Sequence, residues 1–263
     1  MNRIDRAFAA CAAQNTAAFI PFIMAGDPSL EACAALLDAL PAAGADIIEL
    51  GIPFSDPMAD GPVIQAAGLR ALAAGTTLHR VLDLVRNFRE THTTPIVLMG
   101  YLNPVYRYGY EAFAHDAAQA GVDGIILVDL PPEEAEEIEP ILSEQGIALV
   151  RLVAPTSVPA RLNKLTEHAR GYLYYVSVTG ITGAEAAPTA RIAEHIAAIR
   201  AVTALPVCVG FGIKTPADVA AMAPLADGVV VGSAIVRHIH DTQADINQFR
   251  DFVAPLAAAC RRS

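Results

Sequence analysis

Apolar residues recur along this chain with two different spacings, and the two spacings alternate. Short runs rich in β-branched residues are each followed by a longer stretch in which Ala, Leu and Glu place apolar positions at helical intervals. The runs predict strands at residues 19–26, 46–54, 95–101, 124–130, 147–154, 172–179, 206–212 and 228–232. The stretches between them predict helices such as 29–40, 78–91, 132–145 and 189–202. Strand followed by helix, repeated to the end, indicates a parallel sheet.

Several predicted strands are introduced in the same way, by a glycine that ends a helix and a short polar step. Gly44, Gly121 and Gly146 stand at such positions. Eight such units match a closed (β/α)8 barrel better than an open sheet of five or six strands. We therefore predict an α/β protein, a single TIM barrel domain over residues 1–263. Two helices fall outside the repeat: one at about 4–14, expected to plug the barrel bottom, and an extra one at about 63–74, after the second strand.

Composition narrows the class of protein. With 54% hydrophobic residues and a mean hydropathy of +0.40, the chain can bury one large core. A net charge of -10 argues against a nucleic-acid or anionic-membrane surface and favours a small-molecule substrate. The four cysteines have no metal-type spacing, so we expect buried thiols in a reducing cytosol. The start has no sustained apolar run and no uncharged stretch could span a bilayer, which predicts a soluble cytoplasmic protein.

Glu49 is the first candidate for chemistry. In the second predicted strand Ile47, Glu49 and Gly51 share one face, while Ile48 and Leu50 share the other. An acid therefore lies among hydrophobic residues beside a glycine that leaves room. Burial raises the pKa of such a carboxyl and suits it to donate and accept protons, although a satisfied polar residue of the barrel core is the alternative.

Two aspartates follow in the Pro- and Gly-rich loop after that strand. Asp60 is either a second acid of the site or a residue that caps the loop by turn hydrogen bonds. For Asp56 the turn interpretation is favoured. Both residues lie at the carboxyl end of a predicted barrel strand, where the functional loops of this architecture gather.

Two glycine loops indicate a phosphate site. Gly212 follows the seventh strand, and Gly232 with Ser233 follows the eighth and opens a helical segment. Barrels that bind phosphoesters hold the phosphate between these two loops, on backbone amides and a helix N-terminus; ordinary strand-to-helix turns are the alternative. The loop at 177–188, after strand six, has two glycines and is expected to close over a ligand, or else to be a plain flexible loop. Phe22 and Phe211 are candidates to line an aromatic pocket, or core residues.

The sequence lacks the residues that two other kinds of aldolase would need. No Lys falls inside a predicted strand, which argues against a buried Schiff-base amine. The histidines show no paired ligand spacing, which argues against a metal site. Carbon–carbon cleavage in this chain would therefore run on acid–base catalysis.

The whole chain resembles the alpha subunits of tryptophan synthase. Six segments in order carry the resemblance: FIPFIMAGDP (19–28), ELGIPFSDPMADGP (49–62), MGYLNPVY (99–106), DLPPEE (129–134), GITG (180–183) and GFGI (210–213). The resemblance implies retro-aldol cleavage of indole-3-glycerol phosphate to indole and glyceraldehyde 3-phosphate. It also implies a beta subunit that joins indole to serine with its own pyridoxal phosphate, in an alpha2-beta2 tetramer, with no cofactor in this chain.

The same resemblance implies roles for individual residues. Glu49 corresponds to the general acid–base group, and Asp60 to the carboxylate that accepts or stabilises the indole N–H proton. The remaining positions imply a phosphate site at Gly183, Gly212, Gly232 and Ser233, and an indole pocket with its closing contacts at Phe22, Ile64, Met99, Phe211, Tyr174 and Thr182. Two alternatives stay open: a stand-alone indole-releasing lyase, and a non-catalytic phosphate-binding barrel, against which the joint presence of both acids argues.

Overall fold

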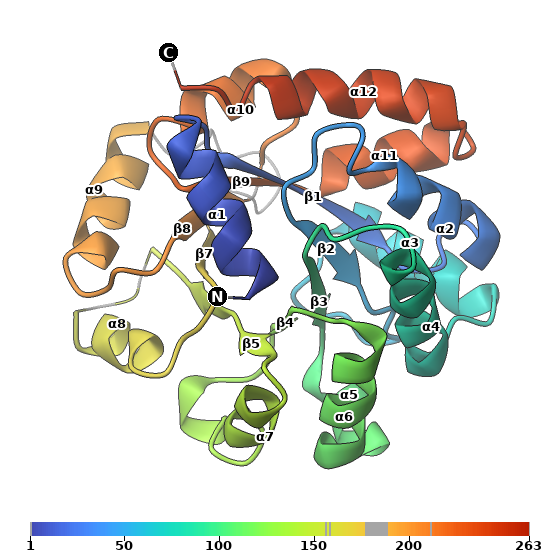
Figure 1. Cartoon of the computed structure of the whole chain (residues 1–263), viewed down its shortest axis with the longest axis horizontal. Coiled ribbons are helices and arrows are strands. Elements are labelled where there is room, and N and C mark those ends of the chain that lie inside the picture. Colours follow the sequence, from blue (N-terminus) through green and yellow to red (C-terminus); the bar gives the residue numbers. More distant parts are fainter. Residues whose placement is uncertain (1, 156, 158, 177–188, 211, 263) are drawn as a thin grey trace.

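The computed structural model describes residues 2–155, 157, 159–176, 189–210 and 212–262. Within them, parallel strands form one sheet in the order β5-β4-β3-β2-β1-β9-β8-β7-β6 (Figure 1). The strands are β1 Ala18–Met24, β2 Ile48–Gly51, β3 Ile96–Gly100, β4 Gly124–Leu127, β5 Ala148–Leu149, β6 Arg151–Val153, β7 Leu173–Val176, β8 Val207–Gly210 and β9 Gly228–Val231.

The helices surround this sheet (Figure 1). They are α1 Arg3–Ala13, α2 Leu30–Ala39, α3 Pro62–Ala73, α4 Leu78–Arg89, α5 Leu102–Tyr108, α6 Tyr110–Ala120, α7 Glu139–Glu144, α8 Pro159–Thr166, α9 Thr189–Arg200, α10 Pro216–Met222, α11 Ser233–Asp241 and α12 Ile246–Ala258, with a 3-10 turn η1 at Pro132–Glu134.

The sheet closes because β5 and β6 are two halves of one strand. β5 pairs with β4 and β6 pairs with β7, and between them the Val150 N–H donates to the Ile125 carbonyl at 2.9 Å. The strand predicted at 147–154 is thus present but divided, and the predicted (β/α)8 barrel is confirmed.

One predicted helix is wrong in its extent. The stretch 132–145 holds the turn η1 and the short helix α7 instead of one continuous helix. Pro140 lies in the first turn of α7, where a missing N–H costs nothing, but a helix running through it from residue 132 would meet the proline ring in its interior.

The barrel wall separates two apolar layers, as the alternation in β2 predicted. Ile48 and Leu50 belong to the cluster between the strands and the outer helices. Ile47 belongs to the cluster inside the barrel. Glu49 shares the inner face with Ile47, so the carboxyl faces the barrel interior.

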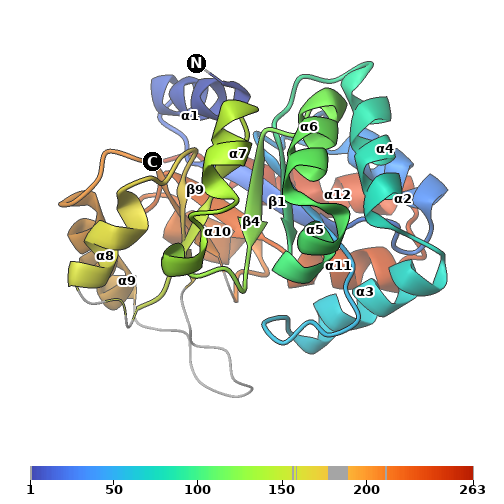
Figure 2. The same ribbon diagram turned by 90° about the horizontal axis from the view of Figure 1, so that it is seen from below.

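Helix α1 closes the end of the barrel where the strands begin, as predicted. Ile4, Phe8 and Cys11 join the interior cluster, and the rings of Phe8 and Tyr172 have centroids 5.8 Å apart. Figure 2 shows α1 at one end of the molecule and α3 at the other. The insertion after β2 therefore covers the end of the barrel where the strands finish.

One expectation from composition is confirmed by the structure: all four cysteines are free and buried. In the part of the chain that the structure describes, no helix has the length and apolar character needed to cross a bilayer. The same residues contain no cluster of His, Cys, Asp or Glu able to hold a metal ion.

Candidate active site

Glu49 is fully buried inside the barrel. In the sheet it is paired with Phe22 on β1 and Val97 on β3. The Tyr172 hydroxyl donates a hydrogen bond to Glu49 Oε1 at 2.7 Å. Burial raises the pKa of Glu49 to about 8, and the hydrogen bond from Tyr172 offsets part of this rise. At neutral pH the carboxyl therefore holds a proton.

The second oxygen of the Glu49 carboxyl makes no hydrogen bond to a described residue. Glu49 Oε2 is buried and has no hydrogen-bond partner among the described residues. Since Oε1 accepts the tyrosine hydrogen, the proton of the neutral acid is placed on Oε2. An unpaired buried oxygen costs stability, so its presence indicates a group kept for chemistry rather than for packing.

Tyr174 and Cys208 lie close to the same carboxyl. Burial first, and then the nearness of the Glu49 charge, raise the pKa values of both groups well above their usual range. Gly210 makes room for Tyr174, because a Cβ on Gly210 would lie 2.1 Å from the tyrosine hydroxyl. Neutral groups therefore lie around Glu49, and among the described residues no cation beside it stabilises the ionised form.

Asp60 lies in the loop between β2 and α3, held by backbone contacts. The Ala59 N–H donates to the Tyr101 hydroxyl at 2.9 Å, and the Gln65 side-chain amide donates to the Asp60 carbonyl at 2.8 Å. Burial raises the pKa of Asp60 to about 6, partly offset by a hydrogen bond from Tyr101. Asp60 is therefore mostly ionised at pH 7, whereas Asp56 is exposed and accepts a hydrogen bond from Ser55 within the same loop.

Three of the expected pocket residues come together beside Glu49. Phe22 belongs to a separate apolar cluster to which Ile64 and Met99 pack. Gly51 makes this arrangement possible, since a Cβ there would lie 2.6 Å from Phe22 Cζ. The glycine next to Glu49 thus leaves space for an aromatic ring, as the sequence indicated.

The two glycine loops lie at the same end of the barrel. Gly212 has φ +76, and a Cβ there would meet no heavy atom of the described residues within 4 Å. Gly232 caps the start of α11, and a Cβ on it would lie 3.6 Å from Phe22 Cβ. Ser233 is the first residue of α11, where backbone N–H groups lack helical partners and can bind an anion. Thr182, Gly183 and Phe211 lie outside the described residues.

The sequence reasoning missed Tyr172 and Tyr101. Tyr172 stands two residues before Tyr174 in a predicted strand and therefore shares its inward face, so the period-two pattern could have found it. Tyr101 follows the end of β3, the same end at which the Asp60 loop leaves β2. Nothing in its sequence position shows that its hydroxyl reaches Ala59 and Asp60.

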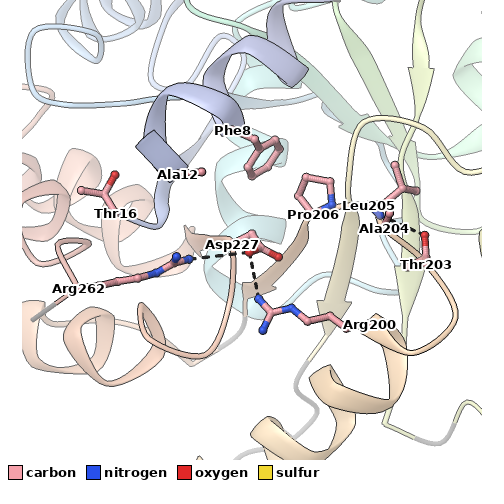
Figure 3. Close-up of a pocket in the computed structure, with 10 residues that line it drawn as sticks. All are labelled: Phe8, Ala12, Thr16, Arg200, Thr203, Ala204, Leu205, Pro206, Asp227 and Arg262. Atoms are coloured by element: carbon pink, nitrogen blue, oxygen red, sulfur yellow. Dashed lines mark hydrogen bonds and ion pairs between the residues drawn. The ribbon is translucent and has the colours of Figure 1, made fainter. Parts of the chain in front are cut away.

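A cavity of about 390 Å³ lies at the other end of the barrel and is not part of this site. Figure 3 shows its lining around Asp227, which pairs with Arg200 at 3.0 Å and approaches Arg262 at 3.9 Å. Asp227 also accepts the N–H of Val207 at the start of β8. These charges are satisfied by one another, and we interpret them as an anchor for the C-terminal segment.

Comparison with known proteins places this arrangement in a family. The family model described as tryptophan synthase alpha chain matches residues 8–261. The tryptophan synthase alpha chain of Phenylobacterium zucineum is 54% identical over 94% of this chain and 89% of its own length. The crystal structure of tryptophan synthase subunit alpha from Legionella pneumophila is 42% identical, with a TM-score of 0.91 over 99% of this chain and 98% of that one. A Mycobacterium tuberculosis tryptophan synthase structure is 38% identical, with a TM-score of 0.92 over 100% and 99% of the two chains.

These matches cover nearly the whole barrel, including both acids and both glycine loops. The chain belongs to the tryptophan synthase alpha chain family and is a lyase that cleaves indole-3-glycerol phosphate.

Proposed function

We propose that Glu49 and Asp60 are the acid–base pair of this cleavage. The observation that carries the proposal is the separation of their pKa values, to about 8 for Glu49 and about 6 for Asp60. At pH 7 one carboxyl is protonated and the other is ionised. Two carboxyls whose pKa values differ in this way can take opposite proton-transfer roles in one reaction, one as the acid and the other as the base.

In this mechanism the Glu49 proton goes to the indole ring carbon that carries the glycerol chain. Asp60 accepts or stabilises the indole N–H proton, so that the electron pair of the indole nitrogen is available to the ring carbon that is protonated. Glu49, now ionised, takes the proton of the adjacent glycerol hydroxyl. The carbon–carbon bond then breaks and its electron pair returns to the ring, whose nitrogen takes back any proton that Asp60 accepted, so that neutral indole leaves. The hydroxyl carbon becomes the aldehyde of glyceraldehyde 3-phosphate.

The surrounding residues are proposed to bind the two ends of the substrate. Phe22, Ile64, Met99 and Phe211 form the indole pocket, with Tyr174 near Glu49. Gly183, Gly212, Gly232 and Ser233 hold the phosphate on backbone amides and one hydroxyl, and Thr182 closes toward Asp60. The backbone at Gly212, where a Cβ would meet no described heavy atom, and the N-terminus of α11 support the phosphate assignment.

The partner is proposed to be a tryptophan synthase beta subunit, in an alpha2-beta2 tetramer. Two large apolar side chains support a docking surface beside the Asp60 loop: Met58 is 86% exposed and Tyr106 is 66% exposed. Met58 stands two residues before Asp60, and Tyr106 is on α5 after β3. Indole would pass to the beta subunit, which holds pyridoxal phosphate and condenses indole with L-serine. We place the complex in the cytoplasm and treat residues 1–263 as one domain.

Indole release from the purified chain, with and without a beta subunit, tests the proposal. Glu49→Gln keeps the shape of the side chain but cannot shuttle a proton, so activity should fall by at least about a hundredfold. Asp60→Asn should also lose most activity. Asp56→Asn is the matched control in the same loop and should leave the activity of the lone chain unchanged. Near-normal turnover of Glu49→Gln would contradict the assignment, and full activity without a partner would favour a stand-alone lyase.

A further inference from the structure

A bidentate ion pair joins the end of β1 to the far end of α3. Arg70 Nε donates to Asp27 Oδ1 at 2.7 Å, and Arg70 Nη2 donates to Asp27 Oδ2 at 2.8 Å. Asp27 is 3% exposed, and the Arg70 side chain is 29% exposed. A planar guanidinium that meets both carboxylate oxygens fixes orientation as well as distance.

The same end of α3 is packed tightly on β1 and the turn that follows it. A Cβ on Gly26, beside Asp27, would lie 1.9 Å from Thr76 Oγ1, just beyond the helix. Ala67 and Ala71, both without exposed surface, pack into the cluster that contains Phe22. The last turns of α3 are therefore held in one position by this packing, and the Asp27–Arg70 ion pair is the polar contact that accompanies it.

The other end of α3 carries Asp60. Gly61 caps the helix without a side-chain hydrogen bond, and its carbonyl accepts the backbone N–H of Gln65 at 3.0 Å. The side chain of Gln65, one turn into the helix, adds the contacts that hold the loop: its amide donates to the Asp60 carbonyl at 2.8 Å and to the Pro57 carbonyl at 3.4 Å. Arg70 and Asp60 are ten residues apart, and residues 62–70 between them form about 12 Å of nearly rigid helix.

We propose that Asp27 and Arg70 are positioning residues for the cleavage reaction, acting through α3 and Gln65 on the placement of Asp60. The proposal rests on the proposed role of Asp60. If the ion pair is lost, α3 can tilt relative to β1, and the loop that Gln65 holds moves with the helix. A displacement of about 1 Å at a reacting group can cost about a hundredfold in rate.

The central test compares Arg70→Met with Arg89→Met. Arg89 is the matched control: its guanidinium pairs with Asp123 at 2.6 Å and is 10% exposed, at the end of the barrel opposite the site. Both changes remove a guanidinium that pairs with a buried aspartate and should lower stability, although Asp123 keeps its ion pair with Arg3 at 2.9 Å. We expect kcat to fall at least about tenfold in Arg70→Met and to change less than about twofold in Arg89→Met. Arg70→Lys keeps the positive charge but cannot make the bidentate contact with Asp27, so its kcat should lie between those of the wild type and Arg70→Met.

The pH dependence of kcat gives a readout that a purely structural role would leave unchanged. Burial holds the pKa of Asp60 at about 6. A loosened loop admits water, which lowers that pKa, so the acidic limb of the kcat profile should move to lower pH in Arg70→Met. Gln65→Ala, at an exposed position, should shift the limb in the same direction without the stability loss.

A second background separates this inference from the proposed function. In Asp60→Asn, adding Arg70→Met should lower the residual rate no further, because both changes act on one group. Retained activity in Asp60→Asn would overturn the proposed role of Asp60. An inactive Asp60→Asn, together with a wild-type kcat and acidic limb in folded Arg70→Met, would overturn only the positioning role. If Arg70→Met does not fold, Asp27→Asn and Gln65→Ala decide: wild-type profiles in both overturn the inference.

Discussion

The Tyr172 hydroxyl lies 2.7 Å from Glu49 Oε1, although the two residues are 123 positions apart in the sequence. The hydrogen bond stabilises the ionised carboxylate and opposes the effect of burial on the Glu49 pKa. It leaves Oε2 without a partner among the described residues. Tyr172 therefore tunes how readily Glu49 gives up its proton and which oxygen carries it.

Tyr172→Phe should raise the Glu49 pKa further above about 8. Without the hydroxyl the ionised form loses its one stabilising hydrogen bond among the described residues, while the burial penalty remains. The limb of the kcat/KM profile that belongs to Glu49 should move to higher pH. Tyr175→Phe is the control, because that hydroxyl contacts His195 outside the barrel interior. An unchanged limb in Tyr172→Phe would contradict the tuning role.

Glu49→Gln should be more stable than the wild type in alkaline solution. The folded pKa of Glu49 is raised from 4.5 to about 8, so the folded state keeps a proton that the unfolded state releases. Between these pH values the free energy of unfolding of the wild type should fall by about 1.4 kcal/mol per pH unit relative to the glutamine variant. Below pH 4.5 the gap should level off. Urea titrations at pH 5 and pH 8.5 measure it, and equal gaps at both pH values would contradict the raised pKa.

Gly212→Ala should weaken affinity for glycerol phosphate more than affinity for indole. Alanine at φ +76 is strained, and strain at this loop displaces the amides proposed to hold the phosphate. Gly146→Ala is a matched control, with φ +75 and likewise no described heavy atom within 4 Å of a Cβ, but a place before β5 at the other end of the barrel. Both variants should lose about 1 kcal/mol of stability. Ligand titration decides, and equal losses of affinity for both ligands in Gly212→Ala would indicate general distortion instead.

A bound substrate analogue should tighten association with the beta subunit. If the partner docks at Met58 and Tyr106 it biases the Asp60 loop, and binding free energies couple reciprocally. The analogue and the beta subunit should each strengthen the other's binding by the same factor, about five- to a hundredfold. Calorimetry measures the affinity for the beta subunit with and without the analogue, and the affinity for the analogue with and without the beta subunit. Identical affinities, together with full activity of the lone chain, would speak for a stand-alone lyase.

The sequence by itself determined the barrel and the position of its main acid. The repeated strand-to-helix period leaves few architectures, and the alternation in β2 puts Glu49 on the same face as Ile47, which is the face inside the barrel. The extra helix and the N-terminal helix that plugs the barrel were predicted as two segments outside the repeat, and both are present as α3 and α1. The stretch 132–145 was mispredicted because helical spacing alone gave too little weight to Pro140.

Only the tertiary structure decided which groups share the site with the two acids. Tyr172 reaches Glu49, Tyr101 reaches the Asp60 loop, and Asp27 meets Arg70 across turns of chain that no local pattern connects. Strand and helix periods depend on neighbours within a few residues, whereas these contacts depend on how the barrel closes. The pKa values that separate the two acids arise from that closure, because burial is a property of the packed molecule and not of any segment.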